Sequence, residues 1–226
     1  MFWLNWRLLP ETLHELQVQP FRARPLLRGY WQLGSSKRFW LLALSSGIPF
    51  NGMFLYVLAA PTFLGDHLKL EPTQFFWFFL LSMSGLTAGA WLSGRVAGKI
   101  KPPQQIRWGY TVMGVVSVAN VLLNLFFPPH AAWSMVPIAL FSFGWALMVP
   151  VVTLMVLDLA PDRRGLVSSL QMCVGSAANA LVAGVLVPLV MHSALALACA
   201  SLGLLLVGWG AWRLETQPKP LSLQGP

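Results

Sequence analysis

The sequence contains few charged residues: Asp, Glu, Lys and Arg make up 10% of its 226 residues, against roughly 25% in soluble domains. Hydrophobic residues make up 56% of the chain, and the mean hydropathy is +0.64. This composition excludes an ordinary soluble domain and indicates a membrane protein. The formal net charge of +8 would suit nucleic acid, but in a membrane protein such an excess is typical of basic cytoplasmic loops. We therefore expect a lipid bilayer, and no nucleic acid, as a partner.

Cysteine is scarce, and the residue types of metal and catalytic sites are scattered. Cys173 and Cys199 both lie in apolar runs, which is typical of small buried side chains rather than of a disulfide framework. The four histidines fall in different loops without metal-ligand spacing, and no HExxH, GxSxG or glycine-rich phosphate loop occurs. The sequence therefore predicts neither an enzyme, nor a cofactor, nor a metal site.

Acidic residues are missing from the middle of every long apolar run. All seven Asp and Glu residues lie outside these runs or at their ends, and no Lys or Arg lies at their centres. A charge at the bilayer centre costs about 2.5–3.5 kcal/mol and usually marks an ion relay when it is present. The sequence thus contains no obvious group that would couple transport to protons or sodium.

Four long stretches without charge predict six membrane-spanning helices. The third stretch is interrupted at Pro128-Pro-His-Ala131 and the fourth at Met191-His-Ser193. Each half is still about 20 residues long, which is enough to cross the hydrocarbon core. The chain is therefore expected to be an all-α membrane protein. Its predicted helices are 39–63, 74–96, 108–127, 133–157, 166–190 and 194–213.

The distribution of Lys and Arg predicts how these helices are oriented. Residues 1–38 contain six of them, 95–107 four, 158–164 two and 213–226 two, whereas the alternate loops contain only Lys69. By the positive-inside rule, both termini are cytoplasmic.

Three regions follow from this arrangement. Residues 1–38, in which Trp and Tyr are interleaved with Arg, are expected to form a cytoplasmic or interfacial segment on an anionic leaflet. Residues 39–213 form the six-helix bundle, and 214–226 form a cytoplasmic tail.

Aromatic and Met side chains form stripes that predict a binding surface. Met53 and Tyr56 share one face of the first helix, and Trp145 and Met148 share one face of the fourth. Such side chains suit loose recognition of apolar ligands, and they suit ordinary packing equally well. The fifth helix is rich in small residues, which predicts burial between other helices, and Gln171 is one of its polar members.

The charged segment 158–171 joins the fourth and fifth helices. Asp158 ends the fourth helix, and Arg163 and Arg164 follow a proline that stops it. No nucleophile–base pair accompanies these charges. We expect the segment to anchor the topology in the headgroup region, or to act as a cytoplasmic gate.

Several segments carry a resemblance to a known family. They are Leu9-Pro-Glu-Thr-Leu13, the run from Tyr30 through Phe39 into 51–61, the segment Gly89–Lys99, and Asp158–Gln171. In their order and spacing the chain resembles the C-terminal half of a major facilitator superfamily transporter, of the bicyclomycin/chloramphenicol-resistance (Bcr/CflA) drug:proton antiporter type. The segment with Arg95 and Lys99 is similar to the second copy of the superfamily's cytoplasmic motif. The usual acidic residue is replaced there by Ser93 or Gly94.

The resemblance implies one six-helix bundle of a twelve-helix transporter of a bacterial inner membrane. The family's work is proton-coupled efflux of small, mostly apolar molecules, and its coupling carboxylate belongs to the other half. We therefore expect a half-length transporter that is incomplete alone and pairs with a missing N-terminal half. The alternatives are a second copy of the chain as that partner, and a non-transporting fragment or structural partner of another membrane protein.

Overall fold

The computed structural model describes residues 23–217. Segment 9–13, most of the tail 214–226 and the first part of the segment 1–38 lie outside these residues. Every described secondary-structure element is helical, and six helices are long and apolar enough to cross a membrane. The predicted all-α class with six spans is confirmed.

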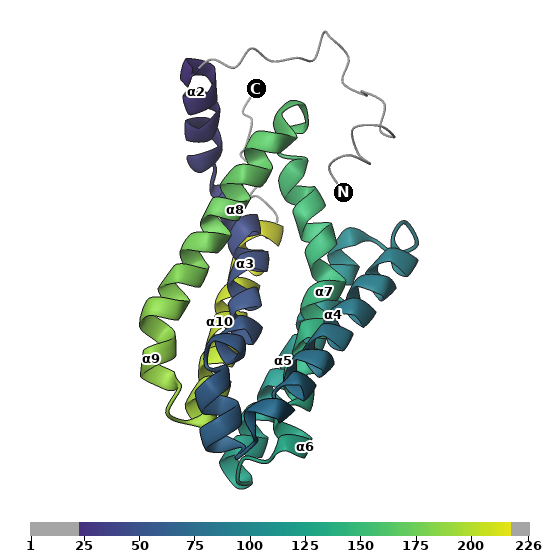
Figure 1. Cartoon of the computed structure of the whole chain (residues 1–226). Coiled ribbons are helices and arrows are strands. Elements are labelled where there is room, and N and C mark those ends of the chain that lie inside the picture. Colours follow the sequence, from purple (N-terminus) through teal and green to yellow (C-terminus); the bar gives the residue numbers. More distant parts are fainter. Residues whose placement is uncertain (1–22, 218–226) are drawn as a thin grey trace, which may run out of the picture.

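The spans follow one another as in Figure 1. They are α3 (Lys37–Leu58), α4 (Phe76–Val96), α5 (Pro102–Phe126), α7 (Val136–Leu157), α8 (Arg164–Leu181) with its continuation, and α10 (Ala194–Thr216). The continuation of α8 is a π-helical segment, η5 (Val182–Leu186), followed by the short helix α9 (Val187–Val190). The shorter elements are α2 (Ala23–Gly34), η2 (Pro61–His67), η3 (Pro72–Gln74), α6 (Ala131–Ser134) and η4 (Pro161–Arg163).

Two predicted spans are interrupted in the structure. The first, predicted as 39–63, leaves α geometry after Leu58 and continues as the π-helical η2, which begins at Pro61. The fifth, predicted as 166–190, passes through η5 just before Pro188. Proline lacks the N–H that would bond to the residue four positions earlier, so the chain widens locally at both places.

The basic loops gather at one end of the bundle, which we call the basic end. Figure 1 shows α2, the α4–α5 connection, the α7–α8 connection and the last turn of α10 at this end, while η2, α6 and the α9–α10 connection lie at the other. At the opposite end the His67 ring hydrogen-bonds the Met191 carbonyl (2.9 Å), which ties η2 to the end of α9.

The helices pack as two groups of three. Figure 1 shows α3, α10 and α8–α9 on one side and α4, α5 and α7 on the other. The helix α7 packs closely against α4 and α5, whereas α3 packs closely against α10. Contacts of α3 with α7 and of α5 with α10 join the groups, and α8 touches mainly α3.

Two glycines one turn apart let α4 approach the backbone of α7. A Cβ added at Gly85 would collide with the Ala139 carbonyl, and one added at Gly89 would collide with the Phe143 carbonyl. Lipid gives helices no hydrophobic drive to associate, so such close van der Waals packing is what holds them together. These glycines are therefore required for the contact between α4 and α7.

The middle of α3 contains Pro49, which leaves the Ser45 carbonyl without an intrahelical donor. The Tyr110 hydroxyl of α5 donates a hydrogen bond to this carbonyl (2.5 Å). On its other side the Pro49 ring lies against Gly208 of α10, where a Cβ would not fit. Neighbouring helices thus satisfy and enclose the proline, as a proline inside a span requires.

We expect Gly89→Val to lower the free energy of unfolding by about 2 kcal/mol, because the added side chain forces α4 away from α7. Denaturant unfolding in mixed micelles measures the change. The matched control is Gly94→Val on the same helix, since nothing lies within 4 Å of a Cβ at Gly94. Equal losses in the two variants would contradict the close contact.

Candidate functional site

A cleft of about 420 Å³ lies between α3, α7 and α8. Two of the predicted ligand-binding residues, Trp145 of α7 and Gln171 of α8, line it together. Further walls come from Ser46 and Phe50 of α3 and Thr153 of α7. Residues separated by about a hundred positions along the chain therefore meet at one surface.

The aromatic wall of the cleft is held in a fixed orientation. The Trp145 indole N–H donates to the Ser46 carbonyl of α3 (2.9 Å), so its only polar group is satisfied. The ring lies 4.9 Å from that of Phe50, centroid to centroid, and Phe50 stacks on Phe54 at 5.3 Å. Trp145 and Phe50, both of which line the cleft, thus form a preorganised apolar wall.

The opposite wall of the cleft is polar but carries no charge. It consists of α8 side chains, among them Ser168, Gln171, Ser176 and Asn179, together with Met172. None of the residues lining the cleft is ionisable. A mostly apolar pocket with a few hydroxyl and amide groups suits neutral organic molecules that make a small number of hydrogen bonds.

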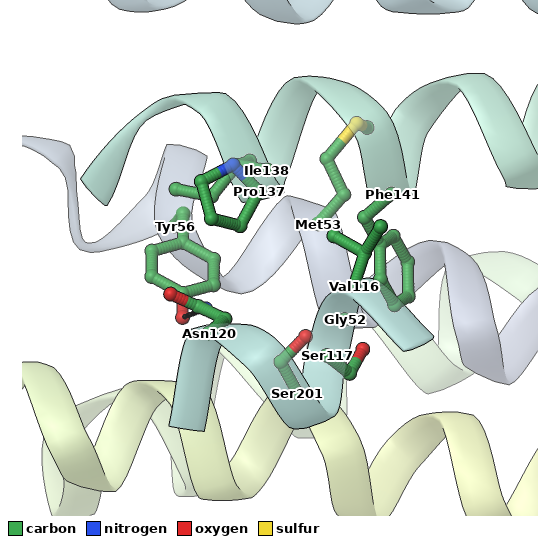
Figure 2. A pocket seen from close by; sticks show the side chains of 10 residues that line it. All are labelled: Gly52, Met53, Tyr56, Val116, Ser117, Asn120, Pro137, Ile138, Phe141 and Ser201. Carbon is green, nitrogen blue, oxygen red and sulfur yellow. Dashed lines mark hydrogen bonds between the residues drawn. The ribbon is translucent and has the colours of Figure 1, made fainter. Parts of the chain in front are cut away.

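Met53 and Tyr56 lie elsewhere, around a small internal cavity of about 10 Å³ (Figure 2). The Asn120 amide donates to the Tyr56 hydroxyl (2.9 Å), and Ser142 donates to the Met53 sulfur (2.7 Å). Figure 2 shows Met53, Tyr56 and Asn120 around this cavity, with Ser201 of α10 also among its walls. The cavity is about the size of one water molecule. As shaped here it is too small for an organic ligand.

Met148 is fully buried and lies outside the cleft. It packs where α5 crosses α7, within 2.8 Å of a Cβ added at Gly109. Trp145, Val149 and Thr153, spaced by four residues, line the cleft instead. The predicted stripe on this helix is therefore rotated by part of a turn from the face that lines the cleft.

Sequence reasoning missed Phe50 and Thr153 as cleft residues. Phe50 lies one turn after Ser46 on α3, on a different face from Met53 and Tyr56. A search for polar and aromatic residues at a spacing of four would have found this second face. The buried stripe through Tyr56 was the more conspicuous pattern.

The small-residue helix α8 is not buried between other helices, contrary to the expectation. It is the least buried of the six spans, and Val167 is its only buried residue between Arg164 and Leu181. Small residues indicate close approach of a helix, but they do not say which helix approaches. Within the described chain, α8 has neighbours mainly on one side.

The predicted gating and topology residues all lie at the basic end. Arg164 and Asp158 form an ion pair across the α7–α8 connection (3.0 Å). Both side chains are well exposed, so the pair contributes little to stability. Arg95 lies over the Trp91 ring (4.3 Å) near the end of α4, and Lys99 lies in the following connection.

Six helices that are long and apolar enough to cross a membrane define a multi-pass membrane protein, and three of them, α3, α7 and α8, line an uncharged, partly aromatic cleft. The family model described as Major Facilitator Superfamily matches residues 1–183. The chain therefore belongs to the Major Facilitator Superfamily, whose members are membrane transporters and not enzymes.

Among curated proteins, the chain is similar to the multidrug resistance protein MdtM of Escherichia coli O157:H7. The two are 26% identical over 145 residues, which is 63% of this chain and 34% of MdtM. The MdtM of Escherichia coli strain K12 is 25% identical over 145 residues, again 34% of its length. The match thus spans about a third of the length of these curated relatives. No solved structure matches the chain.

We expect single cysteines at Thr153 and Gln171 to react with a water-soluble maleimide in membranes, because both positions line the cleft. The background for this experiment replaces Cys173 and Cys199, which are exposed, by alanine. A cysteine at Val118, exposed on α5, is the control and should react only with a membrane-permeant reagent. Silence at both cleft positions, or equal labelling at Val118, would rule out a water-accessible cleft.

Proposed function

We propose that this chain forms one six-helix half of a proton-coupled exporter of small, neutral, mostly apolar compounds. The α3–α7–α8 cleft is its part of the substrate path. The observation that carries this proposal is the combination of a fixed aromatic wall with a polar, uncharged wall in a cleft of about 420 Å³. That volume lies within the range of sites for drug-sized ligands.

The lining chemistry favours one class of substrate. Trp145 and Phe50 offer ring faces, and Gln171 offers both a donor and an acceptor. A cationic substrate would enter an uncharged cleft without a counter-ion and would lose its hydration there. Neutral aromatic amides or alcohols match these walls better. The similarity to a multidrug resistance protein supports broad rather than narrow recognition.

The exposed face of α8 supports a further helical partner. Ser169, Cys173, Ala177, Ala180 and Gly184 are all small and exposed, and they recur at helical spacing. Small residues allow helix backbones to approach closely and are favoured at helix–helix contacts in membranes. In this proposal the partner is a separate six-helix half, and a second copy of the chain is the alternative.

Proton coupling would depend on that partner. The described spans contain no carboxylate in their middle, since the described acidic residues lie in connections or at helix ends. A buried acid that binds and releases the coupling proton would thus come from the other half. The bias of Lys and Arg toward one end and the Escherichia coli relatives support a bacterial inner membrane, with the basic end cytoplasmic.

Binding of radiolabelled chloramphenicol, a neutral aromatic amide, to the chain in lipid nanodiscs tests the cleft by equilibrium dialysis. We expect Trp145→Ala to weaken binding about tenfold, because it removes the aromatic wall of the cleft. Trp133→Ala, at the opposite end on α6, should bind normally, and the cation tetraphenylphosphonium should bind more weakly. No binding, or equal effects of the two tryptophans, would leave a non-transporting structural partner as the better description.

In proteoliposomes that contain only this chain, we expect no export driven by a proton gradient, because the described spans lack a coupling acid. The measurement is accumulation of the same labelled compound with and without an uncoupler. Export that the uncoupler abolishes would overturn the half-transporter proposal. It would point instead to a functional assembly of identical chains.

A further inference from the structure

A second large pocket lies between α5 and α10 at the basic end, and none of its residues lines the α3–α7–α8 cleft. Its volume is about 430 Å³. Arg107 and Thr111 of α5 face Trp209, Arg213 and Thr216 of α10 across it. With Tyr110 and Trp212, the lining comprises two arginines, two tryptophans and three residues that carry a hydroxyl group. The transport proposal makes no use of them.

The pocket carries two positive charges that no acid balances. No carboxylate is among its lining residues. The nearest acid along the chain, Glu215, is paired with Arg38 of α3 (3.0 Å), and its side chain is only 9% exposed. In the part of the chain that the structure describes, neither Arg107 nor Arg213 lies within ion-pair distance of a carboxylate. An anion entering the pocket would meet two free guanidinium groups.

Tryptophan orients one of these guanidinium groups. The Arg213 guanidinium lies 4.7 Å from the centroid of the Trp209 ring, in a cation–π arrangement. Trp212, which is buried, forms part of the pocket floor. Tryptophan and arginine together are typical of the headgroup depth of a bilayer. Arg107 lies in the second turn of α5, and Arg213 lies in the last turn of α10, which agrees with that depth.

Beyond the pocket, the same helix faces become apolar and stay exposed. On α5, Val118 and Leu122 continue the face of Arg107 and are 48% and 47% exposed. On α10, Leu206 continues the face of Arg213 and is 54% exposed. A charged and aromatic head site followed by an exposed apolar surface matches a molecule with a polar anionic head and hydrocarbon tails.

We propose that the α5–α10 pocket binds the phosphodiester headgroup of an anionic phospholipid in the leaflet predicted to be cytoplasmic. Arg107 and Arg213 bind the phosphate oxygens, since guanidinium groups match phosphate with paired charge-assisted hydrogen bonds. Thr111 is placed to bond the glycerol or headgroup oxygens, whereas the Thr216 hydroxyl donates to the Trp212 and Arg213 carbonyls of its own helix. The acyl chains lie along Val118, Leu122 and Leu206. Basic pockets between membrane helices on the cytoplasmic side suit such headgroups.

A plainer role for these arginines is to anchor the topology without binding any particular lipid. The chain contains a matched comparison for that role. Arg95 lies over Trp91 (4.3 Å) at the same end of the bundle, but it lies outside the two-arginine pocket. If the arginines act only through general charge at the membrane surface, replacing Arg95 should weaken lipid binding as much as replacing Arg213. If the pocket is a specific lipid site, only replacing the pocket arginines should weaken binding.

Native mass spectrometry of the purified full chain in detergent tests the site, with phosphatidylglycerol and phosphatidylcholine as probes. We expect wild type to retain phosphatidylglycerol preferentially, and Arg107→Gln with Arg213→Gln to weaken its binding about tenfold. Arg95→Gln should bind as wild type does. Replacing both pocket arginines by lysine keeps the charge but removes the paired hydrogen bonds that a guanidinium group makes to phosphate. This variant should therefore lose an intermediate part of the phosphatidylglycerol binding. This second variant also serves if the glutamine variant fails to fold.

Three outcomes would overturn the proposal. Equal loss on Arg95→Gln would indicate general charge attraction, and undiminished phosphatidylglycerol binding in both double variants would place the lipid elsewhere. Competition by millimolar glycerol 3-phosphate or inorganic phosphate would indicate a site for a soluble phosphate rather than for a lipid. Preference for phosphatidylglycerol that survives these soluble phosphates and disappears with the pocket arginines supports the lipid site.

Discussion

The hydrogen bond from Tyr110 to the Ser45 carbonyl is the interaction on which the arrangement of the bundle depends. In lipid no water replaces a missing backbone donor, so the carbonyl that Pro49 frees needs a protein partner. Because Tyr110 of α5 supplies this hydrogen-bond donor, the bond fixes how α5 lies against α3. The same proline ring is the surface against which Gly208 brings α10. One helix-breaking residue thereby positions three helices, and α3 joins the two groups of the bundle together with the α5–α10 contact.

Different faces of α3 have different structural roles. Met53 and Tyr56 belong to the packed interior, where the Asn120 amide donates to the Tyr56 hydroxyl beside a cavity of about 10 Å³. Ser46 and Phe50 belong to the cleft, where Ser46 contributes a backbone carbonyl that holds Trp145 in place. The packed faces of α3 hold the cleft face in position, which is the usual relation between a rigid scaffold and a binding surface.

Charge and hydropathy were enough to predict the fold class and the number of spans, because crossing a bilayer restricts composition more strongly than it restricts packing. The aromatic stripe of the fourth helix and the polar members of the fifth led to Trp145 and Gln171, which the structure brings together. Periodicity could not decide between Met148 and Val149, since neighbouring faces of a helix that is apolar all round give no contrast. The place of α8 at the edge of the bundle was unpredictable for another reason: small residues show that a neighbour comes close without identifying it.

The π-helical segment η5 has a consequence for how the span tolerates changes in length. A π turn holds one more residue than an α turn, so everything after Val182–Leu186 is set by a local surplus of one residue. Losing one residue there would restore α geometry and leave the orientation of α9 nearly unchanged, because the π turn already accommodates the surplus residue. Losing one residue from the regular part of α8 would instead turn α9 by about 100° about its axis, and the Met191 carbonyl would no longer face His67. This span is thus expected to tolerate a deletion within η5 better than a deletion in α8.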